Sequence, residues 1–215
     1  MASDQTPLSR FPVPELDAMP DDVRERILAV QEKAGFIPNV FTVLAHRPDE
    51  FRAFFAYHDA LMEKDGGLSK AEREMIVVVT SAANDCQYCV VAHGALVRIY
   101  SKNPRLADQL AVNYRGAEIT PRQRAMLDFA LQVATQPGLI EETDFAPLRA
   151  LGFSDEDIWD IGAIAAFFGM SNRLAALTGM WANHEFYLLG RVPKQQSGAA
   201  SKPSPSSGKK KSGKK

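Results

Sequence analysis

Both cysteines of the chain fall in a single Cys-x-x-Cys motif, at Cys86 and Cys89. In a helix, this i, i+3 spacing puts the two sulfurs on one face, close enough for reversible disulfide formation. A place in the first helical turn exposes them to backbone amide donors and to the positive end of the helix dipole, which lower a thiol pKa. His93 follows Cys89 by four residues, so its ring can reach that sulfur one turn along. These residues predict thiol redox chemistry.

A fourth residue, Glu74, joins this group if the helices on either side of Asn84 pack as an antiparallel hairpin. Equal steps on the two sides of that turn place Glu74 opposite His93. A carboxylate facing an imidazole that faces a thiol forms a proton relay, because the carboxylate orients and charges the imidazole, which takes the thiol proton directly or through water. We therefore predict Cys89, Cys86, His93 and Glu74 as the catalytic residues.

The cysteine pair has other possible roles besides redox chemistry. A structural zinc site needs four ligands, but the chain has no second cysteine pair and His46, His58 and His184 are scattered. No metal and no cofactor are therefore expected. A thioredoxin fold uses the same motif within a βαβ unit, which this sequence lacks. An inert pair of core thiols in an intracellular protein stays open as an alternative.

The elements that must position these residues are predicted to be helices, and the fold class to be all-α, because no alternating strand pattern occurs. Ser69 and Glu72 form a capping box that opens a helix to about Ala83. The apolar run at 76–79 suits a buried strand equally well, but the capping box and the lack of a partner strand favour a helix. A second helix covers roughly 86–100. Further helices are predicted over 21–33, 39–46, 48–64 and 141–151, and another begins at Thr120. The last predicted helix is a long apolar stretch that runs from Ser154 through Trp181 to Leu188, with a kink near Gly169.

The two ends of the chain differ from its centre. Four prolines in the first twenty residues predict an extended arm over 1–20, lying on the body or on a neighbouring subunit. From Lys194 onward there are seven lysines and no acidic residue, and this Ser-, Gly- and Pro-rich segment, 194–215, is predicted to be disordered. Between them, 21–193 is expected to form one helical domain.

Charge and composition exclude several classes of protein. Residues 1–193 hold 18 basic and 26 acidic residues, and an acidic body argues against nucleic-acid binding. No uninterrupted apolar run approaches the ~18 residues of a membrane span. The start lacks a basic segment followed by an apolar one, so a cytoplasmic location is expected. Nearly all-apolar helices such as 161–170 have more apolar face than a monomer of this size readily covers, which predicts a homo-oligomer.

The spacing of the predicted site resembles a known signature. The four residues are spaced as Glu74, eleven residues, Cys86, two residues, Cys89, three residues and His93. This spacing resembles the pattern of the alkylhydroperoxidase D-like family, in the peroxidase-related branch of the carboxymuconolactone decarboxylase superfamily. The likeness extends from about residue 21 to residue 188 and includes the Ser-Asn-Arg stretch at 171–173. One departure is Tyr88, where the best-studied type has a histidine between the cysteines.

This resemblance implies a helical bundle assembled into trimers or hexamers, and thiol-dependent reduction of hydroperoxides. It further implies that Cys89 attacks the peroxide and becomes a sulfenic acid, that Cys86 resolves it, and that His93 and Glu74 form the relay. The expected partners are an alkyl hydroperoxide and an unidentified thiol or dithiol reductant. Two other functions stay open: a decarboxylase acting on a lactone acid, and a non-enzymatic redox-sensing oligomer.

Overall fold

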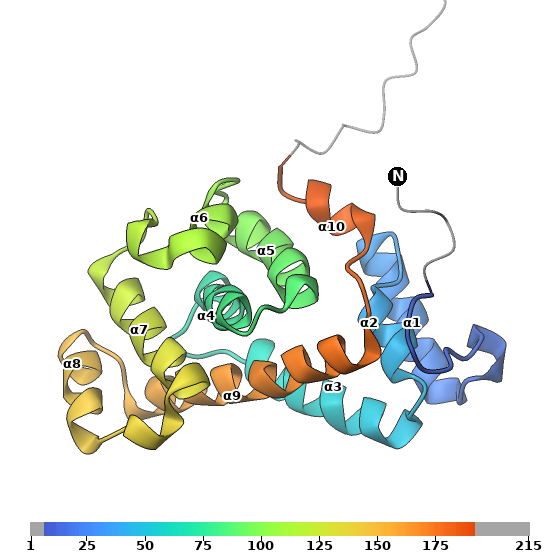
Figure 1. The fold of residues 1–215 in the computed structure, drawn as a ribbon, viewed down its shortest axis with the longest axis horizontal. Helices are drawn as coiled ribbons and strands as arrows, with labels where there is room; N and C mark the ends of the chain where they lie inside the picture. The colour runs from blue at the N-terminus through green and yellow to red at the C-terminus, as the bar shows by residue number, and fades with distance from the viewer. Residues whose placement is uncertain (1–6, 192–215) are drawn as a thin grey trace, which may run out of the picture.

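The computed structural model describes residues 7–191, which form helices and no strand (Figure 1). This confirms the all-α prediction. The tail predicted to be disordered, 194–215, lies outside the described residues, and so do the first six residues of the arm. The helices are α1 (Asp21–Ala34), α2 (Asn39–Leu44), α3 (Pro48–Met62), α4 (Lys70–Ala83), α5 (Gln87–Ser101), α6 (Leu106–Asn113), α7 (Pro121–Thr135), α8 (Phe145–Ala150), α9 (Asp155–Thr178) and α10 (His184–Leu188).

Helix α4 lies at the centre of the molecule, with α5, α6, α7 and α9 around it (Figure 1). Its residues 72–81 are all buried, including the apolar run at 76–79. The capping box is formed: the Ser69 hydroxyl accepts from the Glu72 amide, and the Glu72 carboxylate accepts from the Ser69 amide at 2.9 Å. This local signal decides for a helix where hydrophobicity alone allows a strand.

Helices α4 and α5 form the antiparallel hairpin that the site requires. Asn84 ends α4, and Asp85 has a φ of 53°, a left-handed conformation that turns the chain back within two residues. Cys86 is the N-cap of α5. The turn therefore sets the register between the two helices, and with it the positions of the residues that face each other.

The predicted helix from Ser154 to Leu188 is wrong after Thr178. Helix α9 runs without a break past Gly169 and ends at Thr178, because Gly179 takes the left-handed conformation, with a φ of 72°, that closes many helices. Helix α10 is a separate short element. Helix α6 was not predicted from the sequence.

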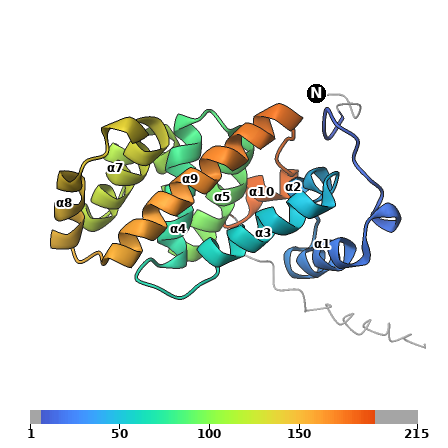
Figure 2. The same ribbon diagram turned by 90° about the horizontal axis from the view of Figure 1, so that it is seen from below.

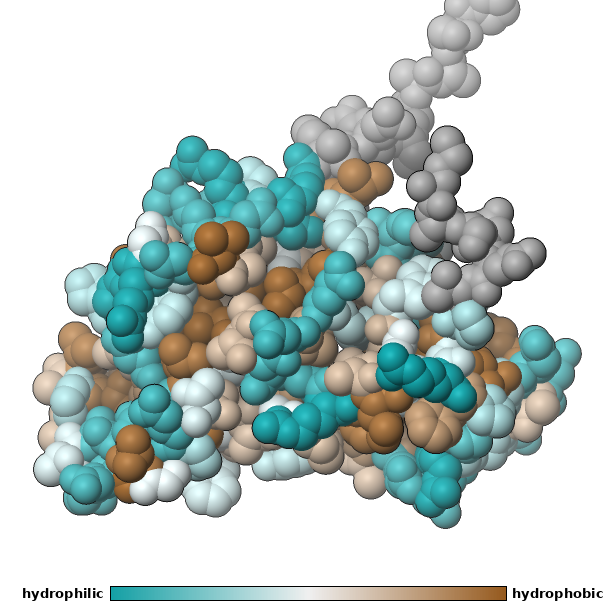
Figure 3. All heavy atoms as spheres, in the orientation of Figure 1, coloured by the Kyte–Doolittle hydropathy of each residue, from teal (hydrophilic) through white to brown (hydrophobic). Residues whose placement is uncertain are grey.

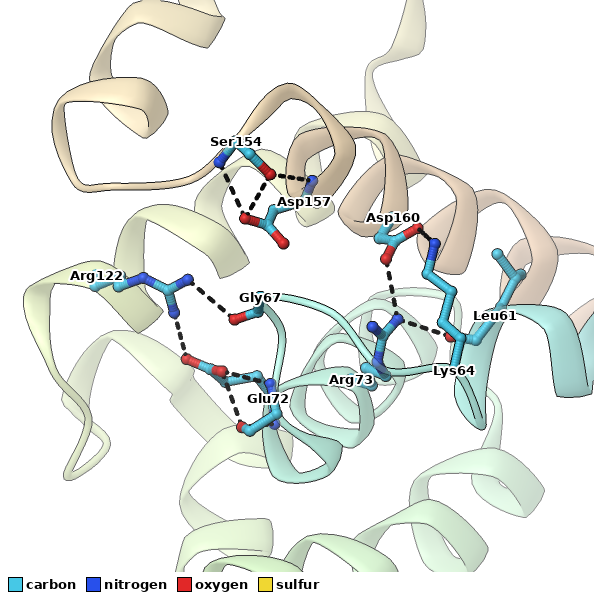
Figure 4. Close-up of polar contacts among 10 residues, drawn as sticks. Leu61, Lys64, Gly67, Glu72, Arg73, Arg122, Ser154, Asp157 and Asp160 are labelled. Carbon is cyan, nitrogen blue, oxygen red and sulfur yellow. Dashed lines mark hydrogen bonds and ion pairs between the residues drawn. The ribbon is translucent and has the colours of Figure 1, made fainter.

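A buried ion cluster fixes the α3–α4 connection to α9 (Figure 4). The Arg73 guanidinium donates to the carbonyl of Leu61 at 2.7 Å and to Asp160 at 3.2 Å, and both charged side chains are almost fully buried. The Lys64 ammonium donates to the other Asp160 oxygen at 2.6 Å. Three charges thus meet where the end of α3, the start of α4 and the first turns of α9 converge.

The same connection is held on its other side by the first turn of α9. Asp157 accepts from the Ser154 amide at 3.0 Å in a second capping box, and the space above Gly67 is occupied by the Asp157 carboxylate. Arg122 of α7 donates to Glu72 at 2.7 Å and to the carbonyl of Gly67 (Figure 4). A side chain at position 67 would collide with Asp157, so this close approach requires glycine.

The described part of the N-terminal arm, residues 7–20, contacts the body of the same chain, one of the two placements expected for it. Arg10 donates from its backbone amide to Thr178 at 2.7 Å and from its guanidinium to the carbonyls of Ala176 and Leu177. These carbonyls belong to the last turn of α9, where carbonyl groups have no hydrogen-bond partner within the helix. The arm therefore completes the end of α9, and it also contains a short 3-10 helix at Leu16–Ala18.

Helix α9 is long and apolar enough, by length and composition, to cross a membrane. It is also the helix on which α3, α4, α7 and α8 pack, and 44% of its most apolar window is buried. Seen from below, it crosses the face of the molecule with α3 beside it (Figure 2). On the side shown in Figure 3, hydrophilic and hydrophobic residues are interspersed.

Candidate active site

The structure brings the four predicted residues together at the α4–α5 hairpin. Glu74 comes from the centre of α4, and the other three come from the start and the second turn of α5. The Nδ1 atom of His93 lies 2.6 Å from Oε2 of Glu74. The side chains are only 14% and 7% exposed, so the two groups interact where solvent screening is weak.

The two cysteines lie at the beginning of α5, with both thiols free and both residues buried. Cys86 is the N-cap residue and Cys89 stands in the first turn, at relative exposures of 6% and 1%. The positive end of the helix dipole and the low polarity of the core act on both sulfurs. The dipole favours a thiolate there, whereas burial opposes it.

The balance of these effects differs between the two thiols. Donation from the Cys89 thiol, with a smaller contribution from the side chain of Asn172, lowers the pKa of Cys86 to about 6. The pKa of Cys89 is raised well above its usual range, because its proton is held in the interaction with Cys86 and because its sulfur is buried. The pair therefore loses its first proton below the ordinary thiol pKa of ~8.5 and shares the second.

This distribution of charge differs from the order expected from the sequence. The register of His93 with Cys89 predicts that Cys89 is the more acidic thiol. In the structure, the negative charge is favoured on Cys86, and His93 also contributes to lowering the pKa of Cys86. The physical reason is that Cys89 is the deeper sulfur and the hydrogen-bond donor of the pair.

Helix α9 supplies two further residues of the site. The Ser171 hydroxyl lies 3.9 Å from the Cys89 sulfur. The Asn172 side chain interacts with both sulfurs, donates to the Ser81 hydroxyl at 2.9 Å and accepts from Asn84 at 3.0 Å. These contacts fix the cysteines against α9 and tie them to the end of α4. The resemblance includes this stretch, but spacing along the chain gave no reason to place it beside the sulfurs.

His58 of α3 is a residue that sequence reasoning missed. It packs against Phe168, whose ring centroid is 6.3 Å from that of His58 and 4.7 Å from that of His93. Burial lowers the pKa of His58, and the charges of His93 and Glu74 both act on it. Its Nδ1 lies 3.1 Å from Asp59, which is in turn bound by Arg26. A second imidazole therefore lies near the Glu74–His93 pair, with Phe168 packed against both histidine rings.

Tyr88, between the cysteines, has a structural partner. Its hydroxyl accepts from the backbone amide of Val40 at 3.0 Å, and burial raises the pKa of the phenol. The amide belongs to the first turn of α2, where amides have no partner within the helix. Tyr88 thus connects the cysteine loop to α2 and takes no part in the Glu74–His93 pair.

Metal binding has no support in the described residues. Between residues 7 and 191, no group of three or more His, Cys, Asp or Glu side chains could hold a metal ion. A groove of about 740 Å³ lies away from the sulfurs, between α2, α3 and the second half of α9.

Known proteins resemble this chain over most of its length. It is 70% identical to a protein from Ralstonia eutropha JMP134 described as an alkylhydroperoxidase AhpD core and an uncharacterized peroxidase-related protein. The match covers 88% of this chain and all of that one, with a TM-score of 0.86. An uncharacterized peroxidase-related protein from Silicibacter sp. TM1040 is 42% identical, with 89% of this chain and 100% of that one covered and a TM-score of 0.83.

Two other comparisons concern shorter segments. A stretch of 62 residues is 32% identical to Sestrin-2 of Bos taurus and of Homo sapiens, and it covers 29% of this chain and 13% of Sestrin-2. The sequence pattern of the carboxymuconolactone decarboxylase family matches residues 48–105, which span α3, the α4–α5 hairpin and all four predicted site residues. With two solved relatives matched over their full length, the chain belongs to the alkylhydroperoxidase D-like family of the carboxymuconolactone decarboxylase superfamily.

Proposed function

We propose that this protein is a thiol-dependent peroxidase that reduces alkyl hydroperoxides through the Cys86/Cys89 couple. The observation that carries the proposal is the pair of free thiols at the start of α5, one with its pKa lowered to about 6, beside a His93–Glu74 contact of 2.6 Å. The peroxidase-related description of two close relatives supports the same class of reaction.

The first step uses the proton that the two sulfurs share. This proton moves onto Cys86, and the Cys89 sulfur attacks one oxygen of the hydroperoxide. The O–O bond breaks, Cys89 becomes a sulfenic acid, and the leaving alkoxide takes the Cys86 proton to give the alcohol. The shared proton thereby acts as a general acid at the atom where charge develops.

The second step forms the disulfide. The Cys86 thiolate attacks the sulfenic sulfur, the S–S bond forms, and the departing hydroxide takes a proton from His93 to become water. Glu74 holds His93 in place through the contact at Nδ1. A dithiol reductant then returns two electrons and two protons to the cysteines, which completes the cycle.

The test is mass spectrometry of both cysteines after a substoichiometric amount of an alkyl hydroperoxide, followed by turnover with a dithiol reductant. We expect loss of both thiols as one intramolecular disulfide, release of one alcohol per disulfide, and repeated turnover. The Cys86→Ser/Cys89→Ser double variant serves as the control and should consume no peroxide.

The alternatives predict different results. A decarboxylase that acts on a lactone acid would keep both thiols in the presence of peroxide and would release carbon dioxide from its substrate. A redox sensor would oxidise once and would show no sustained turnover with the reductant. Either result would overturn the proposal.

A further inference from the structure

Asn172, in the second half of α9, is a polar side chain buried against the cysteine hairpin and only 2% exposed. Its Nδ2 atom donates to the Ser81 hydroxyl at 2.9 Å, and the carbonyl of the same Ser81 accepts from the backbone amide of Cys86 at 2.9 Å. The hydroxyl of the preceding residue, Ser171, lies 3.9 Å from the Cys89 sulfur. The side-chain amide of Asn172 therefore lies beside both cysteines.

The orientation of this amide decides what it offers to the sulfurs. Asn84 donates to its Oδ1 atom at 3.0 Å, so the oxygen is already engaged. An amide NH2 group has two hydrogens, and the Ser81 hydroxyl accepts one of them. The second hydrogen remains for the sulfurs, and hydrogen bonding from Asn172 acts to lower the pKa of both thiols. Asn172 is thus a hydrogen-bond donor to the cysteine pair.

A thiolate at this depth needs such a donor, because burial removes the water that would otherwise solvate the charge. Titratable groups face the pair from two helices: His93 and Tyr88 on α5, and Glu74 on α4 through its contact with His93. From α9 the pair is faced by Ser171 and Asn172, which carry no charge. An uncharged donor stabilises a thiolate without holding it at one position.

The proposed peroxidase cycle, on which this inference rests, requires the negative charge to move between the two sulfurs. At rest the charge is favoured on Cys86 and the proton lies on Cys89. Before the attack on the O–O bond, that proton passes to Cys86 and the charge passes to Cys89, so the pair gains and loses nothing. A fixed cation beside one sulfur would oppose this exchange, whereas a donor within reach of both supports the charge in either place.

We propose that Asn172 is a catalytic residue of the thiol couple, and that its amide donates to whichever of the two sulfurs carries the negative charge. Ser81 and Asn84 act through it, because one accepts its first hydrogen and the other engages its oxygen. Loss of the amide should therefore destabilise the thiolate at both cysteines, whereas loss of Ser81 should not.

The test is a titration of the thiolate by absorbance and by the rate of alkylation with iodoacetamide, without peroxide. Asn172→Leu keeps nearly the same side-chain size and removes the donor. We expect about tenfold less thiolate than in the wild type at a pH below 6, the effect of losing one hydrogen bond to a charged group. Asn172→Ala should change the titration in the same direction, and it takes the place of the leucine variant if that protein does not fold.

Ser81→Ala is the matched control. It removes the same link between α4 and α9, but the amide of Asn172 stays held by Asn84. Its denaturation midpoint should fall as in Asn172→Leu, while its thiolate titration should match that of the wild type. An equal change of the titration in Ser81→Ala and Asn172→Leu, or an unchanged titration in both Asn172 variants, would show that Asn172 only holds the helices together and would overturn the proposal.

Single-cysteine backgrounds test whether the amide serves both sulfurs. Asn172→Leu should lower the thiolate fraction at a given pH in Cys86→Ser and also in Cys89→Ser. A change in only one background would overturn the claim that the donor follows the charge. These titrations use no peroxide, so they are separate from the test of the proposed function. A protein with the expected titrations that consumes no hydroperoxide would keep Asn172 as the thiolate donor and overturn the peroxidase.

Discussion

His93 and Glu74 are joined by a 2.6 Å contact that crosses from the second turn of α5 to the buried centre of α4. The only imidazole beside the cysteines on α5 is therefore anchored to the most buried helix of the protein. Because Glu74 occupies Nδ1, the second ring nitrogen is the one that would exchange a proton with the sulfurs in the proposed reaction.

Removal of either member of this pair should slow the reaction of the cysteine thiols with peroxide near neutral pH. We expect Glu74→Gln and His93→Gln to lower the rate of peroxide-driven thiol loss by about 10²-fold, the usual contribution of a positioned acid–base group. The difference should shrink only at a pH well above ~8.5, because the interaction with Cys86 and burial both raise the pKa of the Cys89 thiol. The control is Glu63→Gln, an exposed carboxylate on the α3–α4 connection. Equal rates for all three variants would show that the pair is structural.

The two cysteines should give different products when studied singly. In Cys86→Ser, peroxide should leave a sulfenic acid on Cys89 that a dimedone-type reagent traps, because the resolving thiol is gone. In Cys89→Ser, Cys86 should stay largely unoxidised over the same time. Mass spectrometry of the trapped adduct decides the order. A sulfenic acid on Cys86 in the second variant would assign the attack to the sulfur that holds the negative charge at rest.

The pH dependence of the thiolate should change with the same variants. In the wild type, thiolate absorbance should rise with an apparent pKa of about 6, so that the thiolate is lost as the pH falls below this value. Folding stability should follow with the same sign: the gain from the lowered Cys86 pKa is complete above the unfolded thiol pKa of ~8.5 and is lost as the pH falls from there to about 6. In Cys86→Ser the low-pH rise should vanish, and Cys89 should titrate at or above ~8.5, since burial remains. An unchanged titration in that variant would place the low pKa on Cys89.

His58 should influence the rate of proton release more than the equilibrium at the thiols. The groups that face it are Asp59 on its own helix, Arg26 on α1 through Asp59, Glu74 on α4 and His93 on α5. His58→Phe keeps the contact with Phe168 and removes the ring nitrogens. We expect slower peroxide turnover at low buffer concentration, recovery when imidazole is added, and an unchanged thiolate titration.

The control for this experiment is His46→Phe, at an exposed position beside Phe11. It should turn over at the wild-type rate in every buffer. If His58→Phe behaves in the same way as His46→Phe, the proton leaves the site by another route.

The glycine at position 67 should be important for stability. Gly67→Ala places a methyl group against the Asp157 carboxylate, which caps α9, so either the loop or the cap must shift. We expect a loss of roughly 1–3 kcal/mol in the free energy of unfolding. Gly138→Ala is the matched control, because no atom lies within 4 Å of the position that its methyl group would take. Comparable denaturation midpoints for the two variants would contradict this account.

Local signals in the sequence were sufficient for the elements that carry the site. The capping boxes at Ser69 and Ser154 and the turn at Asn84 depend on residues within three or four positions of one another, and all three have the structure that their residue types predict. The end of α9 was missed although its signal is also local: Gly179 follows the last turn as a C-cap glycine.

The rest of the site depends on contacts that no local pattern encodes. Ser171 meets a sulfur 82 positions earlier in the chain, and His58 approaches the relay only because α3 packs on α9 beside Phe168. The acidity of the two thiols could not be ranked from spacing, because it follows from the depth of each sulfur and from which one donates to the other.

The contact between Arg10 and the last turn of α9 has a consequence for the order in which the chain is completed during synthesis. The arm is translated first, yet its hydrogen-bond acceptors are the carbonyls of 176–178, which leave the ribosome after nearly all of the helical body. The central helix α4 likewise lacks its cover until α9 has emerged. The cysteine hairpin therefore stays in an incomplete core until α9 has been synthesised, and the hydrogen bonds of Arg10 form only after that.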